Sequence, residues 1–299
     1  MPNHEILDTK RNAEFNHQIT GGLHLGVQAL QYMKIRGFHN IASTIASNER
    51  FSAESKAMAV IGISLANQLA LLRNEPADIS ICSAMHAAMG DVIDGSYGTS
   101  YTKTAFINGC IRFCKTNNLL RSGEEAKSLE EQLAADIMGV WSEHSWENLL
   151  LSAGIPTERS NTGEDLAGTD LWIQTSSGGW LSIDVKSQPS TAKRHATNKG
   201  VVIDREVVFD AHDTTAQQFG LYVATTTEQR SAYLAFDNPP SSGNIAPIDF
   251  RGRSAAINAA HDVFNTLEYC VNNAELKVYD RISSANGVHF IPQKQRRAR

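Results

Sequence analysis

Residues 169–189, "TDLWIQTSSGGWLSIDVKSQP", constrain the fold more than any other segment of the chain. Two runs rich in apolar and β-branched residues flank a short Ser/Gly turn, and Pro189 ends the second run. This pattern is typical of a β-hairpin, because proline cannot continue a strand ladder. We therefore expect a sheet in the second half of the chain, with strands at 169–174, 180–187, 201–209, 219–226 and 231–236.

The first half of the chain carries helical periodicity instead. Ser52 and Asn74 are start and stop signals for one of its helices. Apolar residues recur at three- and four-residue spacing in four segments, 21–37, 52–74, 80–93 and 102–120.

Two longer helical patterns follow, one over 124–154 that ends at Gly154, and a closing one over 254–273. The order of elements predicts an α/β fold in two parts. We expect a mostly helical domain over 1–122 and, over 123–299, a domain with an α/β or α+β core.

Composition excludes several classes of protein. With 299 residues, of which 41% are hydrophobic, the chain is long enough to bury a core. We find no apolar run of the roughly 18–20 residues that a membrane span needs, and no signal-peptide pattern. We therefore expect a soluble, cytoplasmic protein without a membrane partner. Its four cysteines are too few for a disulfide framework, and the spacing of Cys110 and Cys114 predicts shared burial on a helix.

The net charge of −5 is unevenly distributed. Residues 124–170 carry eleven acids against Lys127 and Arg159, whereas residues 186–205 carry five basic residues against Asp204. An acidic cluster followed by a basic segment suits a site that collects metal ions and faces a polyanion. Solvated charge on separate surfaces would give the same counts.

The second strand of the hairpin carries an acid and a lysine on one face. Side chains alternate across a strand, so Asp184 and Lys186 project together from "WLSIDVK". If the hairpin is antiparallel, Asp170 lies close to both. Two neighbouring carboxylates repel unless a cation joins them, and Mg²⁺ prefers hard oxygen ligands and water. With a lysine to orient a water, this arrangement suits phosphodiester hydrolysis.

A surface hairpin with a salt bridge worth at most about 1 kcal/mol is the alternative. The acid-x-Lys spacing does not decide between them, because the chain contains five such pairs. Only Asp184 and Lys186 follow an apolar alternation and a strand opened by another acid, Asp170. The prediction therefore depends on this context.

The residues "GTD", thirteen further residues and "DVK", preceded by an acid-bearing helix, resemble the PD-(D/E)XK nuclease superfamily. The resemblance implies a restriction-endonuclease-like core over 123–299, in which helices flank a mixed sheet. The resemblance covers roughly residues 125–236, and Thr169 stands where the superfamily motif has proline. It implies that Asp170 and Asp184 bind Mg²⁺, with Mn²⁺ as a substitute. It also implies that Lys186 assists the attacking water.

Many members of this superfamily add a glutamate from the helix that packs on the sheet. We take the buried stripe of the 124–154 helix as Leu133, Ile137, Val140, Trp141 and Leu151. A step of 100° per residue then places Glu147 inside the stripe and Glu143 at its edge. Because a buried carboxylate is costly unless it binds something, Glu147 is the first candidate for a third metal ligand and Glu143 the second. A snorkelling surface glutamate is the alternative for either.

The segment after the hairpin, "STAKRHATNKG", is interpreted as a basic loop. Lys193, Arg194 and Lys199 are candidates for phosphate contacts, and Gln188 lies on the same strand face as Lys186. An ordinary flexible loop is the alternative. The helical domain would then read or position double-stranded DNA.

These features predict a Mg²⁺-dependent DNA endonuclease that hydrolyses phosphodiester bonds with a metal-activated water. Two copies in a homodimer would cut both strands. One alternative is a non-catalytic DNA-binding or scaffold protein on the same fold. Another is the nuclease subunit of a transposition or defence complex, active only with its partner.

Overall fold

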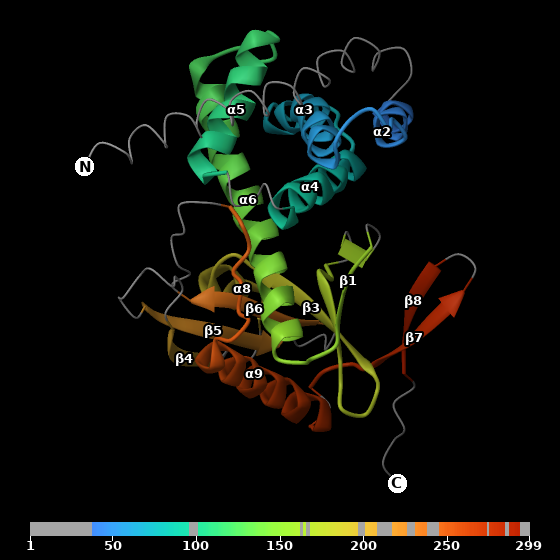
Figure 1. The fold of residues 1–299 in the computed structure, drawn as a ribbon, viewed down its shortest axis with the longest axis vertical. Coiled ribbons are helices and arrows are strands. Elements are labelled where there is room, and N and C mark those ends of the chain that lie inside the picture. The colour runs from blue at the N-terminus through green and yellow to red at the C-terminus, as the bar shows by residue number, and fades with distance from the viewer. Residues whose placement is uncertain are drawn as a thin grey trace. The chain divides into compact units, whose positions relative to one another are not determined.

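The computed structural model describes residues 38–95, 101–161, 164–165, 168–196, 201–207, 217–225, 231–237, 245–273, 275–284 and 287–293. Within these ranges the chain forms seven helices and an eight-stranded mixed sheet (Figure 1), so it is a mixed α/β protein. The described residues divide into two compact units. The first unit holds those up to Trp141 together with 245–247, and the second holds the others.

The first unit is helical, in agreement with the periodicity of its sequence. Ser52 caps α3 by accepting a hydrogen bond from the Ser55 N–H, and Asn74 follows its end with a positive φ of 54°. The helix expected over 21–37 lies outside the described residues. The helices of this unit are α2 (Phe38–Ala46), α3 (Ala53–Leu72), α4 (Ile79–Asp94), α5 (Lys103–Thr116) and the first part of α6 (Gly123–Ser152).

Helix α3 provides much of the core of the first unit. Its residues Ile61, Ile63, Leu65 and Leu69 are fully buried. By length and composition α3 is apolar enough to cross a membrane, although polar residues interrupt its apolar sequence. A core helix passes the same test, and α3 is largely buried, so the finding does not assign it to a membrane.

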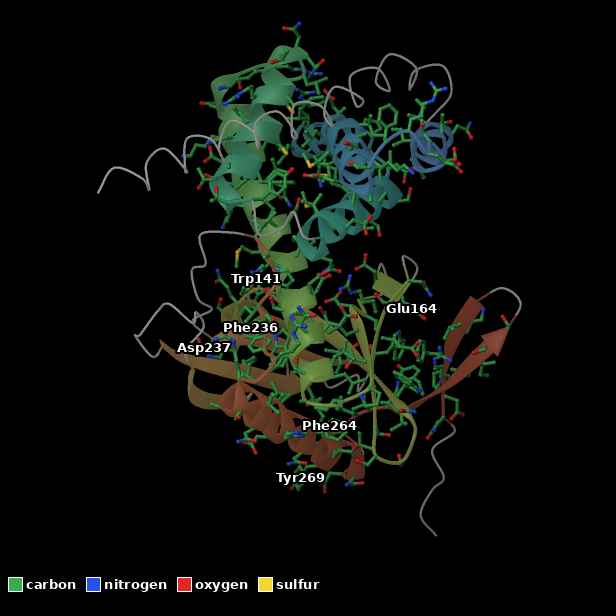
Figure 2. The ribbon with its side chains drawn as sticks, viewed as in Figure 1. Trp141, Glu164, Phe236, Asp237, Phe264 and Tyr269 are labelled. Carbon is green, nitrogen blue, oxygen red and sulfur yellow. The ribbon has the colours of Figure 1, made fainter. Side chains whose placement is uncertain are left out.

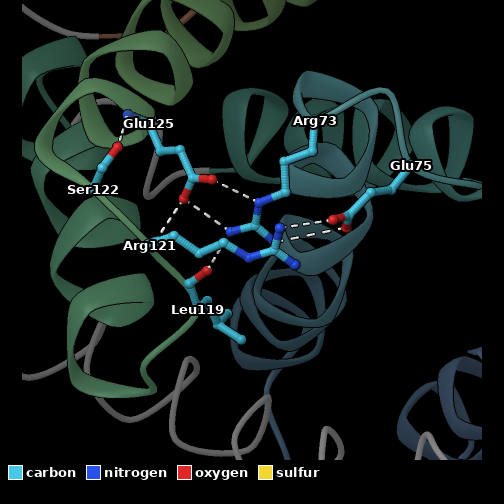
Figure 3. A network of polar contacts seen from close by, with 6 residues as sticks. All are labelled: Arg73, Glu75, Leu119, Arg121, Ser122 and Glu125. Carbon is cyan, nitrogen blue, oxygen red and sulfur yellow. Dashed lines mark hydrogen bonds and ion pairs between the residues drawn. The ribbon is translucent and has the colours of Figure 1, made fainter.

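A network of ion pairs connects the end of α3 to the start of α6 (Figure 3). Arg73 donates to the two carboxylate oxygens of Glu125 at 2.7 and 2.9 Å, and to the carbonyl oxygen of Leu119 at 2.7 Å. Arg121 donates to Glu75 at 2.7 Å. The bidentate contact with Arg73 is the main reason that the pKa of Glu125 falls to about 2. The Arg73–Glu125 pair is therefore charged at neutral pH, and its contribution to stability is lost as the pH falls through about 2.

The second unit is built on one mixed sheet with the strand order β1-β2-β3-β6-β5-β4. Strand β3 pairs antiparallel with β2 and parallel with β6. A parallel pair needs a crossover connection, and α8 with β4 and β5 provides it. The bounds are β1 (Thr157–Arg159), β2 (Leu171–Gln174), β3 (Trp180–Lys186), α8 (Pro189–His195), β4 (Val201–Val207), β5 (Gln217–Thr225) and β6 (Ser231–Asp237).

Helices cover both faces of this sheet. On one face, α8 places Ala192 against Tyr222 and Ala235. Phe236 follows Ala235 on β6 and therefore points to the opposite face. On that face the Phe236 ring stacks on Trp146 of α6, with the ring centroids 4.9 Å apart (Phe236 in Figure 2). The coarse prediction of a mixed sheet flanked by helices is therefore confirmed.

The closing part of the chain adds a helix and a hairpin. Helix α9 (Ser254–Asn272) is the closing helix that the sequence predicts, and it packs along β4 and β5. Strands β7 (Tyr279–Ser284) and β8 (Gly287–Pro292) form an antiparallel hairpin that joins the sheet where Tyr279 pairs with Trp180.

Four elements of the second unit, α8, β1, β7 and β8, were not predicted from the sequence. Residues 189–195 form helix α8, so the prediction of a loop is wrong for this segment. Strand β1 has only three residues, too few for a visible alternation. Strands β7 and β8 are largely exposed and therefore carry little apolar pattern.

The predicted domain boundary after residue 122 falls at the start of α6, whereas the compact units divide inside this helix, between Trp141 and Ser142. Helix α6 is continuous over 30 residues. Neither turn residues nor a change of periodicity therefore marks the division in the sequence.

Candidate functional site

Asp170 comes directly before β2, at the end of the hairpin where Asp184 lies on β3. The register ends where Leu171 pairs with Ile183, and the Asp170 N–H donates to the carbonyl oxygen of the same Ile183 at 2.8 Å. The Asp170 side chain turns towards β3, where Oδ2 accepts a hydrogen bond from the Val185 N–H at 2.6 Å. The structure thus brings the two hairpin acids together.

Lys186 forms an ion pair with Asp184 on the same face of β3. Its Nζ contacts Oδ1 of Asp184, a residue that is only 8% exposed. Burial opposes the charge of Lys186, but the carboxylates of Asp184 and Asp170 outweigh it and raise the pKa of the lysine. Lys186 is therefore protonated at neutral pH and acts as a cation rather than as a general base.

The pKa of Asp170 is raised well above its ordinary value. Burial is the largest cause, followed by the negative charges of Glu143 and Asp184. Lys186 and the Val185 N–H act in the opposite direction without offsetting these effects. Glu143 and Asp184 therefore both repel the charged form of Asp170, and a bound cation would relieve this repulsion.

The two candidate helix glutamates have different surroundings. Glu143 is half-buried, and its charge acts on Asp170. Glu147 is paired with Arg159 of β1, whose Nε donates to Oε2 at 2.6 Å and whose Nη2 contacts the same oxygen. The charge of Glu143 therefore acts on the hairpin acid Asp170, whereas Glu147 is held in an ion pair with Arg159.

The buried stripe that favours Glu147 does not hold along the whole of α6. Its members up to Trp141 are buried, but Leu151 is 50% exposed. After Ser142, α6 buries a different set of large apolar residues, Trp146, Leu149 and Leu150. At 100° per residue these lie on another side of the helix. The apolar stripe of α6 in the first unit therefore does not predict which side of the helix is buried in the second unit.

The hairpin carboxylates fit a hard divalent cation. Among the described residues, none donates a hydrogen bond to Asp170 Oδ1 or to Asp184 Oδ2. The buried Asp184 Oδ1 contacts the ammonium group of Lys186 but has no hydrogen bond of regular geometry. Across these same residues, no cluster of three or more His, Cys, Asp or Glu side chains is arranged as a metal cage. Mg²⁺ needs only one or two carboxylates when waters and substrate phosphate oxygens complete its shell. The residues therefore fit an open Mg²⁺ site with two carboxylate ligands.

A chain of hydroxyl groups lies beside the acids and was not predicted from the sequence. Thr169 Oγ1 and Ser182 Oγ are 2.7 Å apart, and Ser182 Oγ and Ser231 Oγ are also 2.7 Å apart. Gly168, directly before Thr169, has a φ of 85°, a conformation that favours glycine. These contacts fix the start of β2, and with it Asp170, against β3 and β6. The sequence pattern gives one clue, since Ser182 shares a strand face with Asp184.

Strand β6 adds Tyr233 to the site. Tyr233 pairs with Asp184 in the parallel register, so the two side chains point to the same face of the sheet. Lys186 Nζ lies 5.9 Å from the centroid of the Tyr233 ring, within cation–π range. Sequence reasoning missed Tyr233 because periodicity within β3 does not reveal which strand lies beside it.

The residues predicted to contact nucleic acid lie on or next to α8. Gln188 is the exposed N-terminal neighbour of this helix, and the exposed side chains of Lys193 and Arg194 belong to its last turn. Lys193 Nζ lies 5.5 Å from the centroid of the buried Tyr222 ring. Lys199 lies outside the described residues. A short helix packed on the sheet thus presents cations close in sequence to Lys186.

Comparisons with protein-family models, with curated proteins and with solved structures find no match for this chain. Its function must therefore be inferred from the side chains that surround Asp170 and Asp184.

Proposed function

We propose that this chain is a Mg²⁺-dependent DNA endonuclease of the PD-(D/E)XK type, with a restriction-endonuclease-like core in its second unit. The convergence of Asp170, Asp184 and Lys186 on one side of the sheet carries this proposal. A surface salt bridge would not bury one acid almost completely and raise the pKa of its neighbour. Perturbed, buried carboxyl groups of this kind are typical of functional sites.

Each group has a role in phosphodiester hydrolysis. Asp170 and Asp184 hold Mg²⁺, for which Mn²⁺ substitutes, and Glu143 rather than Glu147 is the helix carboxylate whose charge acts on this two-carboxylate site. The bound metal supplies Lewis acidity and lowers the pKa of a water. Lys186, as a cation, orients the attacking water and offsets the negative charge that develops on the phosphate. Glu147, through its ion pair with Arg159, fastens α6 to β1.

The basic end of α8 supports a polyanionic substrate. Lys193 and Arg194 are exposed there, and arginine and lysine contacts to phosphates dominate affinity for DNA. In the proposed complex these residues, with Gln188 and Lys199, contact the backbone of double-stranded DNA next to the cleaved bond. The helical first unit positions the duplex, and the protein acts in the cytoplasm.

Cleavage of supercoiled plasmid tests the proposal. The purified full chain is incubated with Mg²⁺, Mn²⁺ or EDTA, beside the variants Asp184→Asn and Lys186→Gln. We expect the wild type to cut with either metal and not with EDTA, and each variant to lose at least about 100-fold in rate. Lys127→Gln, at an exposed lysine, is the matched control for removing a lysine. Equal cutting by the wild type and Asp184→Asn would refute the site.

The Lys186–Asp184 ion pair favours a second candidate, a non-catalytic DNA-binding or scaffold protein, because it neutralises Asp184 without a cation. Thermal unfolding separates the two. A metal site stabilises the folded chain by about 2.7 kcal/mol at a Mg²⁺ concentration of 100 times Kd, and Asp184→Asn removes this gain. A scaffold protein binds DNA without cleavage and gains nothing from Mg²⁺. Cleavage that requires an added partner identifies the nuclease subunit of a complex.

A further inference from the structure

We infer that Tyr233 is a positioning residue that holds the ammonium group of Lys186 over its ring, beside the hairpin acids. This inference rests on the proposed function. Tyr233 comes from β6, where it pairs directly with Asp184 of β3, so both side chains project from the same face of the sheet. The half-buried ring lies with its centroid 5.9 Å from Lys186 Nζ.

Lys186 needs a neighbour other than Asp184 in order to act. Its long side chain is partly exposed, and its ion pair with Asp184 uses the carboxylate that the proposed cation also needs. When Asp184 neutralises a cation, its attraction for Lys186 weakens and the two positive charges repel each other. The face of an aromatic ring attracts an ammonium group without using a carboxylate. Tyr233 therefore keeps Lys186 near the phosphate when Asp184 changes partner.

The same ring also lies against the basic end of α8. The ring centroids of Tyr233 and His195 are 6.0 Å apart, and Tyr233 borders the cluster in which Ala192 packs on Ala235. An ordinary core tyrosine would be enclosed by apolar side chains. This one is half-buried and has a lysine on one side and the last turn of α8 on another. Its position thus connects the lysine of the site to the helix proposed to contact DNA.

Two substitutions separate the ring from its hydroxyl group. Tyr233→Leu removes the ring, whereas Tyr233→Phe keeps it. In plasmid cleavage with Mg²⁺, we expect kcat to fall at least about tenfold in Tyr233→Leu while KM changes less than about threefold, because the ring acts on Lys186 and not on DNA. Tyr233→Phe should recover most of the loss. Tyr269→Leu is the matched control, since Tyr269 lies on α9 and is 65% exposed (Figure 2).

NMR of the lysine side chains measures the placement of Lys186 without cleavage. In ¹³C-lysine-labelled protein, the ring current of Tyr233 should shift the ε-methylene resonance of Lys186 upfield of that of exposed Lys127. Lys186→Gln assigns the peak. The shift should disappear in Tyr233→Leu and persist in Tyr233→Phe.

The two readouts separate failure of this inference from failure of the nuclease proposal. An unshifted Lys186 resonance, or an unchanged kcat in a Tyr233→Leu variant that circular dichroism shows to be folded, overturns the role of Tyr233. A ring-dependent shift in a wild-type chain that never cuts DNA supports the placement of Lys186 and overturns the nuclease proposal. Tyr233→Met is the second variant without a ring should Tyr233→Leu not fold.

Discussion

At the scale of single residues, Asp170 lies where folding disfavours its charged form. Burial, then the charges of Glu143 and Asp184, raise its pKa well above the ordinary value of about 3.9. Between these two pKa values the folded state binds more protons than the unfolded state, so stability falls as the pH rises through this window. Above the raised pKa the cost is fully present. Such a cost is typical of residues kept for function rather than for stability.

Asp170→Asn should therefore raise the melting temperature at pH 7 when no divalent cation is present. The amide carries no charge, and its oxygen can still accept the hydrogen bond from the Val185 N–H. Each 1 kcal/mol gained corresponds to about 2–4 °C for a domain of this size. Thermal unfolding between pH 4 and pH 8 measures the effect, and the gain should shrink towards pH 4.

A second aspartate gives the contrasting control for this measurement. Arg251 is the main reason that the pKa of Asp249 falls to about 2, so Asp249→Asn removes a favourable charge and should give no gain at pH 7. A lower melting temperature for Asp170→Asn at pH 7 would show that the site does not strain its carboxylate.

The sequence pattern within the hairpin was enough to select three residues of the candidate site. It was not enough to select Glu143 and Tyr233. Asp170, Asp184 and Lys186 follow from alternation within one hairpin, where neighbours in sequence are neighbours in space. The choice of Glu143 depends on which side of α6 is buried on the sheet, and Tyr233 depends on the pairing of β3 with β6. Both are set by contacts between distant segments, which periodicity does not record.

At the scale of elements, α8 shows how a short helix escapes detection in the sequence. "PSTAKRH" has no apolar stripe, and Pro189 suggests an interruption. In the structure Pro189 occupies the first turn, where a missing N–H has no effect, and the fully buried Ala192 packs on the sheet. A helix this short is stabilised by packing rather than by propensity. The β7–β8 hairpin likewise depends on Phe290 stacking on Trp172, with centroids 3.9 Å apart.

Helix α8 should set the salt dependence of DNA binding. Lys193→Gln with Arg194→Gln is expected to lower the slope of log affinity against log salt by about two, because each lost phosphate contact removes about one. Fluorescence anisotropy with duplex DNA in EDTA measures binding without cleavage. Arg251→Gln with Arg281→Gln, at two exposed arginines of the second unit that the proposal does not assign to DNA, is the matched control. An unchanged slope in the α8 variant would place the DNA elsewhere.

At the scale of the whole molecule, the change of periodicity along the chain predicts which segments form helices and which form the sheet. It does not predict where the two compact units divide. Helical spacing before residue 120 and alternation after residue 169 correctly separate helical and sheet-forming sequence. The compact units nevertheless divide inside α6, because one continuous helix contributes to both. Glu143 lies just beyond this division. The sequence could therefore place the candidate acids on a sheet but could not state which turn of α6 lies nearest in charge to Asp170.

One pair of hairpin acids per chain, counted over the described residues, limits what a single copy can do to duplex DNA. In the proposed reaction one site would hydrolyse one strand at a time, and a second copy related by two-fold symmetry would supply the second cut. We therefore expect nicked circles to precede linear plasmid at low protein concentration. The share of linear product formed directly should rise with concentration, and gel quantification measures both products.

Mixing the wild type with excess Asp184→Asn provides the decisive comparison. Mixed pairs contain one active site, so nicking should continue while direct linear product falls, and sedimentation of the same mixtures reports pair formation. Lys127→Gln added in the same excess should leave the ratio of products unchanged. If Asp184→Asn also leaves that ratio unchanged, single copies cut the two strands in turn, and the homodimer is not the active form.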